Sequence, residues 1–156
     1  MRHKNILATS ALFCALAVAG CTTASVDTTQ TTAIAPASLD VSQSDLETGK
    51  ARFREANYGL AEKHFRKAVE LRGDNAEAWL GLAASYDELG RFDFADRAYE
   101  QLLKVAGRKP RIVNNMGYSQ LLRGNEKKAR ALLLEARRGM TDTTVVDANL
   151  ALLDRA

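Results

Sequence analysis

Apolar and small residues recur with a period of 34 residues through most of this chain. Each period holds two stretches with apolar residues three or four positions apart, the spacing of one helix face. A short break, such as Leu89-Gly90-Arg91, separates the two stretches. The residues in register at this shift include Ala61, Ala95 and Ala129; Gly49, Ala83 and Gly117; Phe65, Tyr99 and Leu133; and Ala56, Gly90 and Gly124. The pattern predicts three helical hairpins, over 42–75, 76–109 and 110–143.

Small residues in register predict how the two helices of a hairpin meet. Antiparallel helices approach to about 8 Å only where side chains are small, so we expect Ala83 to face Ala95. Asp74 and Asn75 precede the helix that carries Trp79, and either side chain suits an N-cap. We expect Trp79 and Tyr86 to belong to the core.

The second period carries a family resemblance in Trp79, Leu82, Ala83, Tyr86, Ala95 and Tyr99. These residues and the 34-residue period resemble the tetratricopeptide repeat (TPR), which implies an all-α solenoid. The first repeat departs from the pattern, because Asp45 stands where an apolar anchor is usual. Residues 144–156 are predicted to form a capping helix, with Val146, Leu150 and Leu153 on one side and charges on the other.

Residues 1–20 have the layout of a secretory signal. Arg2 and Lys4 precede an apolar run of about fifteen residues, shorter than the roughly 20 that span a bilayer. Val18-Ala19-Gly20-Cys21 resembles the lipobox of bacterial lipoproteins. That resemblance implies cleavage before Cys21, a diacylglyceryl thioether on its sulfur and acylation of the new amino terminus, for example with palmitate. The alternative is a soluble secreted protein with a chance cysteine.

Residues 21–41 are predicted to form a flexible tether behind the lipid. They are rich in Thr, Ser and Ala, with one Pro and no aromatic residue, so they cannot bury a core. A random coil of this length spans roughly 20 to 30 Å. Thr22 follows the cysteine in place of the Asp that favours the inner membrane of bacteria with the usual sorting. We therefore expect a lipid-anchored protein on the periplasmic face of the outer membrane.

Cysteine and charge counts limit the chemistry of the mature protein. Cys14 leaves with the signal and Cys21 carries lipid, so no thiol remains for a disulfide, a metal or catalysis. Loss of Arg2 and Lys4 reduces the 22 basic residues to 20 against 19 acidic ones, a net charge of about +1. This balance does not indicate binding of nucleic acid.

No catalytic or cofactor-binding pattern is present in the sequence. Removal of His3 leaves His64 as the one imidazole, which we expect to be a solvated helix residue. The acids Asp87 and Glu88 are adjacent instead of one helical turn apart, and there is no phosphate-binding loop. We expect a protein that is not an enzyme and uses no cofactor or metal.

The TPR resemblance implies that a partner binds along a concave face lined by the first helix of each repeat. Asn114 and Asn115 are the most informative of these positions, because a side-chain amide can both donate to and accept from the backbone of an extended peptide. One of the two is expected to face a neighbouring helix, and the alternative is that both are structural or surface polar residues. The matching positions that we select as partner-binding candidates are Lys50, Arg54, Asp87, Glu88, Arg111, Asn114, Asn115 and Tyr118.

Charge is uneven along the repeats. Residues 41–100 carry nine basic and twelve acidic residues, whereas residues 108–140 carry nine basic residues against Glu126 and Glu135, about +7. This basic third repeat suits an acidic partner or the phosphates of a membrane surface, and a solvated helix face explains it equally well.

The stretch from Asn114 to Gly124, NNMGYSQLLRG, with ANLALL at 148–153, carries a second resemblance. It resembles the lipoproteins of tight-adherence (Flp) pilus assembly, the TadD family, and so do the lipobox, tether and repeats. This implies an accessory that binds a pilus secretin or another assembly component. Two alternatives remain: an adaptor of peptidoglycan-remodelling enzymes, and an enzyme regulator or degenerate enzyme. With about three repeats, self-association could complete the groove.

Overall fold

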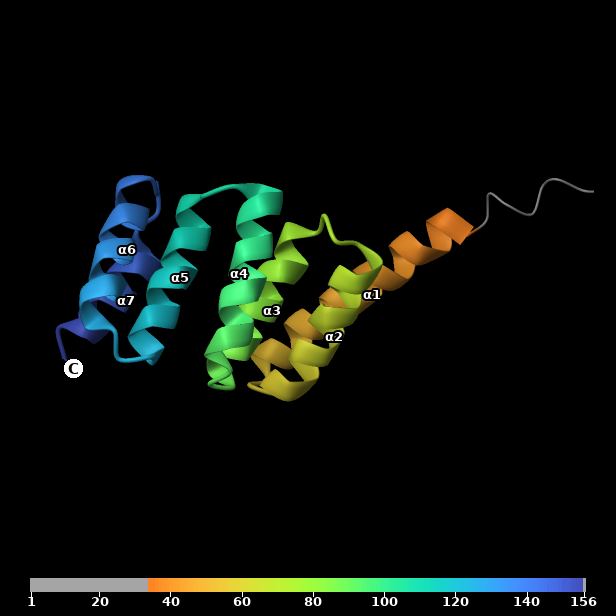
Figure 1. Ribbon diagram of the computed structural model, residues 1–156, viewed down its shortest axis with the longest axis horizontal. Coiled ribbons are helices and arrows are strands. Elements are labelled where there is room, and N and C mark those ends of the chain that lie inside the picture. The colour runs from red at the N-terminus through yellow and green to blue at the C-terminus, as the bar shows by residue number, and fades with distance from the viewer. Residues whose placement is uncertain (1–33, 156) are drawn as a thin grey trace, which may run out of the picture. The chain divides into compact units, whose positions relative to one another are not determined.

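The computed structural model describes the backbone of residues 34–155 and the side chains of residues 41–155. This part of the chain holds seven helices and no strand (Figure 1). The helices are α1 (Ile34–Arg54), α2 (Tyr58–Leu71), α3 (Ala76–Glu88), α4 (Phe92–Ala106), α5 (Pro110–Leu122), α6 (Glu126–Arg138) and α7 (Thr144–Leu153). The predicted signal, the lipobox with Cys21 and the start of the tether lie outside the described residues.

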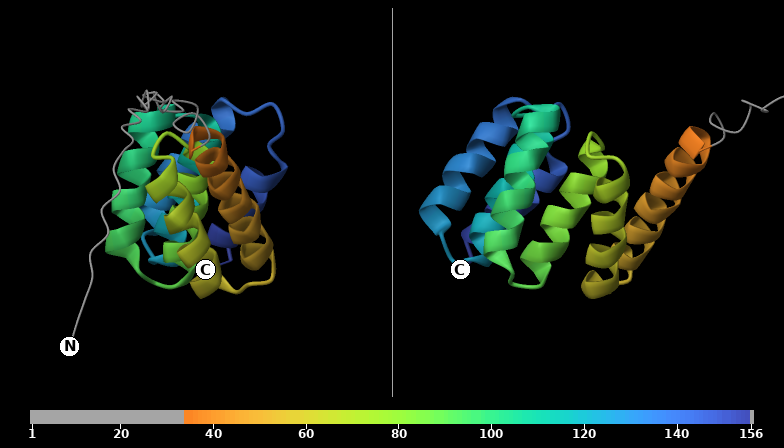
Figure 2. Two further views of the ribbon diagram at one scale, coloured as in Figure 1. Left: turned by 90° about the vertical axis from the view of Figure 1, so that its right-hand side faces the viewer. Right: turned by 45° about the vertical axis from the view of Figure 1, so that its right-hand side comes forward.

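The helices pack in chain order as three antiparallel hairpins followed by a single helix. α1 packs on α2, α3 on α4 and α5 on α6, and α1, α3 and α5 also contact one another in sequence. The hairpins succeed one another in Figure 1 and in the right-hand view of Figure 2, and α7 lies against α5 and α6. The predicted all-α solenoid of three helix-turn-helix repeats and a terminal helix is confirmed.

Helix α1 begins inside the predicted tether. Residues 34–41 were expected to be flexible, but they form the first two turns of this 21-residue helix. The fold accommodates Pro36 because it lies in the first turn, where a backbone N–H has no partner within the helix. The first helix of the repeats therefore starts at Ile34, before the predicted end of the tether at residue 41.

The backbone conformation at the turn within each hairpin recurs with the 34-residue period. Gly90 and Gly124 have φ of 68° and 74°, in the left-handed region that glycine adopts without steric cost. Ala56 occupies the same place in the first hairpin at φ 56°, where its Cβ is strained. The predicted N-cap is confirmed, because the Asn75 side chain accepts from the backbone N–H groups of Glu77 and Ala78.

Close packing between helices depends on small residues. Ala61, Ala95 and Ala129 have no exposed surface, as expected of positions where two helices touch. The ring of Phe65 lies against Gly49 of α1 and Gly81 of α3, and a Cβ on Gly49 would come within 2.8 Å of it. These two glycines let an aromatic ring fill the space between α1, α2 and α3.

Ion pairs join each second helix to the repeat that follows. One partner always comes from the same register position of the second helix, occupied by Glu62, Asp96 and Arg130. The N···O distances are 3.6 Å for Glu62–Arg91, 2.7 Å for Asp96–Arg123 and 2.7 Å for Arg130–Asp154. The repeats are thus joined by charge as well as by apolar packing.

The terminal helix differs from the capping helix that was expected. Val146 and Leu153 are buried as predicted, but the exposed surface of the helix is partly apolar and not formed by charged residues alone. Asp147 pairs with Arg137 of α6 at 2.7 Å, and Val145 and Leu152 are exposed on the outside at 58% and 43%. The aspartates turn toward α6 because its arginines stabilise their carboxylates. Among residues 34–155, no helix is both long and apolar enough to cross a bilayer.

Candidate functional site

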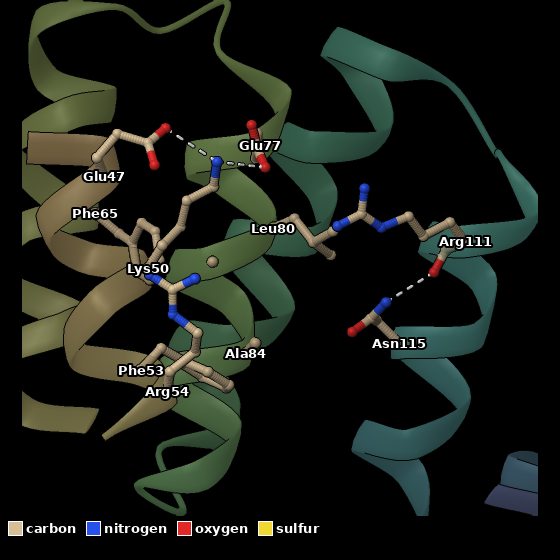
Figure 3. Close-up of a pocket in the computed structure, with 11 residues that line it drawn as sticks. Glu47, Lys50, Phe53, Arg54, Phe65, Glu77, Leu80, Ala84, Arg111 and Asn115 are labelled. Carbon is tan, nitrogen blue, oxygen red and sulfur yellow. Dashed lines mark hydrogen bonds and ion pairs between the residues drawn. The ribbon is translucent and has the colours of Figure 1, made fainter. Parts of the chain in front are cut away.

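A hollow of about 370 Å³ lies along the first helices of the three repeats (Figure 3). Its lining comes from α1, α3 and α5, with one ring from α2. The lining residues are Glu47, Lys50, Phe53, Arg54, Phe65, Glu77, Leu80, Gly81, Ala84, Arg111 and Asn115. Several are one or two 34-residue periods apart, so equivalent positions of successive first helices build one continuous face.

The floor of this groove is apolar and its rim is charged. Phe53, Phe65 and Leu80 supply aromatic and aliphatic surface. On the rim, Lys50 reaches both Glu47 at 3.1 Å and Glu77 at 2.9 Å, which joins α1 to α3. The hydrogen bond to Glu77 raises the pKa of Lys50. Its charge is therefore neutralised within the groove.

Two arginines give the groove a net positive charge, because its lining holds three basic residues against the two carboxylates of Glu47 and Glu77, about +1. Arg54 of α1 and Arg111 of α5 lie on opposite sides of the hollow, and the Arg111 side chain extends toward Leu80 (Figure 3). Neither guanidinium has an ion-pair partner within residues 41–155. Asn115 donates from its amide nitrogen to the Arg111 carbonyl oxygen at 2.8 Å, so its side-chain oxygen points into the groove. The groove can accept an apolar side chain, a carboxylate and a backbone N–H.

Of the eight predicted partner-binding residues, the structure brings four together in the groove: Lys50, Arg54, Arg111 and Asn115. Glu88 and Tyr118 are half-buried and lie outside its lining. Burial and the neighbouring Glu88 carboxylate raise the pKa of the Tyr118 hydroxyl. This pair connects α3 to α5 outside the groove lining.

The placement of Asp87 in the groove was wrong. Its side chain is buried and accepts from the Tyr99 hydroxyl at 2.9 Å and from the Ser119 hydroxyl at 2.6 Å. Arg123 lies 3.6 Å away. Burial nevertheless raises the pKa of Asp87 above its ordinary value, because loss of water outweighs these contacts. Asp87 therefore joins α3, α4 and α5 and is not available to a partner.

The placement of Asn114 was wrong for a related reason. This residue is buried, and its side-chain oxygen accepts from the Asn149 amide of α7 at 3.1 Å. The equivalent residues of the earlier repeats are Leu46 and Leu80, both largely buried. The register itself was thus a signal that this position is largely buried, although Leu80 also contributes to the groove floor. Of the two asparagines, Asn115 is the one in the groove.

Seven of the eleven lining residues were not among the eight candidates: Glu47, Phe53, Phe65, Glu77, Leu80, Gly81 and Ala84. Glu47 and Gly81 occupy the same register position as Asn115, so the period could have identified them. Phe65 belongs to a second helix, and it reaches the groove because Gly49 and Gly81 leave room for its ring. No pattern of first-helix positions could have indicated it.

His64 is not the solvated residue that was expected. It is half-buried, and its Nδ1 lies 2.9 Å from the Asp45 carboxylate, which Lys67 also approaches to 2.9 Å. Burial acts to raise the pKa of Asp45, but the hydrogen bonds with His64 and Lys67 outweigh it and hold the pKa below its ordinary value. Asp45 stands where an apolar anchor is usual and faces α2, so its buried carboxylate needs His64 and Lys67 of that helix as partners.

Neighbouring helices balance part of the charge of the basic third repeat. Arg108 forms two hydrogen bonds with Glu135, at 2.7 and 2.8 Å, and Arg123 binds Asp96 through two nitrogens. Within residues 41–155, the basic side chains of residues 108–140 without an ion pair are Lys109, Arg111, Lys127, Lys128 and Arg138. Arg111 is the one among them that lines the groove.

Comparison with known proteins supports the repeat fold. A tetratricopeptide-repeat family model matches residues 52–114, and no curated protein matches the chain. The TPR domain of Arabidopsis OM64 is similar at 19% identity and a TM-score of 0.66, over 76% of this chain and 98% of that one. A structure titled "Functional Characterization of Pseudomonas Aeruginosa pilF" is similar at 25% identity and a TM-score of 0.61, over 75% of this chain. The alignment spans about half, 54%, of the pilF chain.

These findings show a TPR solenoid, and solenoids of this kind present an extended concave surface for protein partners.

Proposed function

We propose that this chain is a lipid-anchored scaffold that binds a protein segment in the groove and acts by binding alone. In this proposal it assists assembly of a tight-adherence (Flp) pilus machine, of which a secretin or another component is the partner. Its place is the periplasmic face of the outer membrane. The observation that carries the binding role is a groove with an apolar floor and two arginines without an ion-pair partner in the described residues.

The chemistry of the groove supports an extended partner segment with a carboxylate. Arginine binds carboxylates through two parallel hydrogen bonds, which fixes their orientation. Arg54 and Arg111 stand on either side of apolar surface from Phe53 and Leu80, so an aliphatic or aromatic side chain could lie between two such contacts. The side-chain oxygen of Asn115 is suited to accept from a backbone N–H of the same segment.

The membrane and pilus parts of the proposal are supported by the sequence. The secretory layout and lipobox resemblance end at Cys21, and Thr22 follows it. The stretch from Asn114 to Gly124 resembles the pilus assembly lipoproteins, and pilF is among the similar structures. Attachment through two or more acyl chains would hold the solenoid stably at the membrane.

Affinity capture from membranes tests the groove and its partner together. The wild-type chain and an Arg54→Ala/Arg111→Ala variant are crosslinked in cells, captured and analysed by mass spectrometry. We expect a secretin or another pilus component with the wild type, and at least about tenfold less with the variant. The control, Lys63→Ala/Lys104→Ala, removes two exposed charges from α2 and α4 and should capture as the wild type does.

The identity of the captured proteins separates the alternatives. Peptidoglycan synthases or hydrolases in place of pilus components would assign the chain to wall remodelling. A partner retained in full by the Arg54→Ala/Arg111→Ala variant would remove the groove from the proposal.

The lipid anchor is tested separately. In cells that express the wild type, labelled palmitate should be incorporated into the chain. The chain should be recovered in the outer-membrane fraction. Cys21→Ser should abolish both the label and the membrane recovery, because serine forms no thioether. Cys14→Ser is the matched control and should change neither.

A further inference from the structure

The terminal helix α7 occupies the place of a first helix in a fourth repeat. Thr144 follows Pro110, the first residue of α5, by 34 residues. Val146 and Leu153 are buried, as are the residues one period earlier, Ile112 and Ser119. α7 therefore packs on the third repeat as each earlier first helix packs on the repeat before it.

A following helix covers the equivalent face of α5 but not that of α7. Asn114 of α5 is buried because Asn149 of α7 binds it. Its equivalent one period later, Ala148, is exposed. Val145 and Leu152 flank Ala148 on the same side at helical spacing, and they are exposed at 58% and 43%. Such a stripe differs from the polar outer face that ends most solenoids.

The stripe carries no unbalanced acidic charge. Asp147 and Asp154 lie on the other side of α7 and pair with Arg137 and Arg130 of α6, both at 2.7 Å. In the described part of the chain, the charged residues near the stripe lie at its two ends: Asp142 before the helix and Arg155 just beyond it. A second apolar helix can therefore approach the centre of the stripe, formed by Val145, Ala148 and Leu152, without meeting a carboxylate.

The stripe is complementary to a copy of itself. Val145 and Leu152 are equally distant along the chain from the midpoint between Ala148 and Asn149, and so are Asp142 and Arg155. Two α7 helices packed antiparallel about that midpoint would place Val145 beside Leu152 of the second copy. Asp142, whose carboxylate accepts from the Thr144 N–H, would face Arg155 of that copy. The small Ala148 at the centre permits close approach.

We propose that two copies of this chain associate through α7, antiparallel across a two-fold axis between Ala148 and Asn149. Each copy contributes Val145 and Leu152 to the apolar centre, and Asp142 and Arg155 form an ion pair at each end. The interface is isologous, so it closes at two copies and does not lead to filaments. It is independent of the groove and leaves Arg54 and Arg111 unobstructed.

Sedimentation equilibrium of the full chain in a fixed detergent, over a range of concentrations, tests this proposal. A reversible monomer–dimer equilibrium is expected, and Leu152→Asp should raise the dissociation constant at least about tenfold by placing a charge in the apolar centre. Leu134→Asp is the matched control, because Leu134 is exposed at 38% on α6 and should leave the equilibrium unchanged. Circular dichroism verifies that both variants fold.

A double-mutant cycle on the end pair tests the orientation. Asp142→Asn keeps an N-capping side chain and removes its charge, and Arg155→Gln removes the opposing charge. Each single variant should weaken the dimer about threefold, and the double variant should weaken it no further. A wild-type chain that stays monomeric, a dimer indifferent to Leu152→Asp, or additive effects of Asp142→Asn and Arg155→Gln would each overturn the proposal. Association of α7 with a different protein instead of a second copy would overturn it as well.

Discussion

The buried carboxylate of Asp87 provides the sharpest test of how the second and third repeats are held together. Its side chain is 2% exposed and accepts hydrogen bonds from Tyr99 of α4 and Ser119 of α5. Asp87→Ala leaves these two hydroxyls without their acceptor. Arg123 keeps Asp96 at 2.7 Å, so its guanidinium is not left unpaired.

The expected loss follows from these contacts. A buried polar group without a partner costs about 1–3 kcal/mol, which applies in full to the Tyr99 hydroxyl. Ser119 loses its acceptor but still accepts from Arg123 at 2.9 Å, so it adds about 1 kcal/mol, for a total of about 2–4 kcal/mol. Removal of Asp87 also relieves the unfavourable burial of its charge, which is seen in its raised pKa, so we expect the lower part of this range. The free energy of unfolding should fall by about 2–3 kcal/mol. Asp87→Asn keeps the shape and one acceptor, and should lose about half as much.

Urea denaturation followed by circular dichroism gives the free energy of unfolding, with Glu100→Ala as control. Glu100 is an exposed residue of α4 without an ion pair in the described part of the chain, and its replacement should change stability by less than about 0.5 kcal/mol. Hydrogen exchange should show reduced protection in α5 to α7 and little change in α2, because repeats are coupled to their neighbours. A loss below about 0.5 kcal/mol for Asp87→Ala would refute the assigned role.

Three further predictions concern the first repeat. Ala56→Gly should stabilise the fold by about 1 kcal/mol in urea denaturation, because the alanine is held at φ 56°. Gly49→Ala should destabilise it by about 1–3 kcal/mol in the same assay, because the new Cβ would meet the Phe65 ring at 2.8 Å. Asp45 has a pKa below its ordinary 3.8, so its stabilising contribution is complete above that pH and is lost as the pH falls through the lower folded value. Unfolding midpoints measured from about pH 6 down to about pH 3 should show this loss in the wild type and less of it in Asp45→Asn.

Each of these predictions has its own control or contrary result. Gly90→Ala places a side chain at a matching left-handed turn and should destabilise the second repeat by an amount similar to what Ala56→Gly gains. Equal stability of the Gly49→Ala variant would mean that the Phe65 ring is not confined by α1. An unchanged acid profile in Asp45→Asn would assign the loss to other carboxylates, such as Asp96, whose pKa is lowered by its hydrogen bond with Arg123.

Local features of the sequence determined the repeat and most of its helices. The spacing of apolar residues, the small residues at the helix contacts and the N-cap at Asn75 depend on backbone geometry that recurs every 34 residues. Period and register therefore sufficed to predict the solenoid. They also located Lys50, Arg54, Arg111 and Asn115, because equivalent positions of stacked first helices share one face.

Tertiary structure decided which polar side chains remain available. Asp87 and Asn114 occupy positions that match a binding face, yet Tyr99 and Ser119 bind the first and Asn149 binds the second. These partners lie twelve to 35 residues away in the sequence, and a buried polar group must find them wherever the fold brings them. The same holds for α7, where Asp147 pairs with Arg137 of α6 at the surface and an apolar stripe lies on a different side of the helix. The 34-residue period determines which residues share one face of a helix, but only the neighbouring helices determine which side chains contact that face.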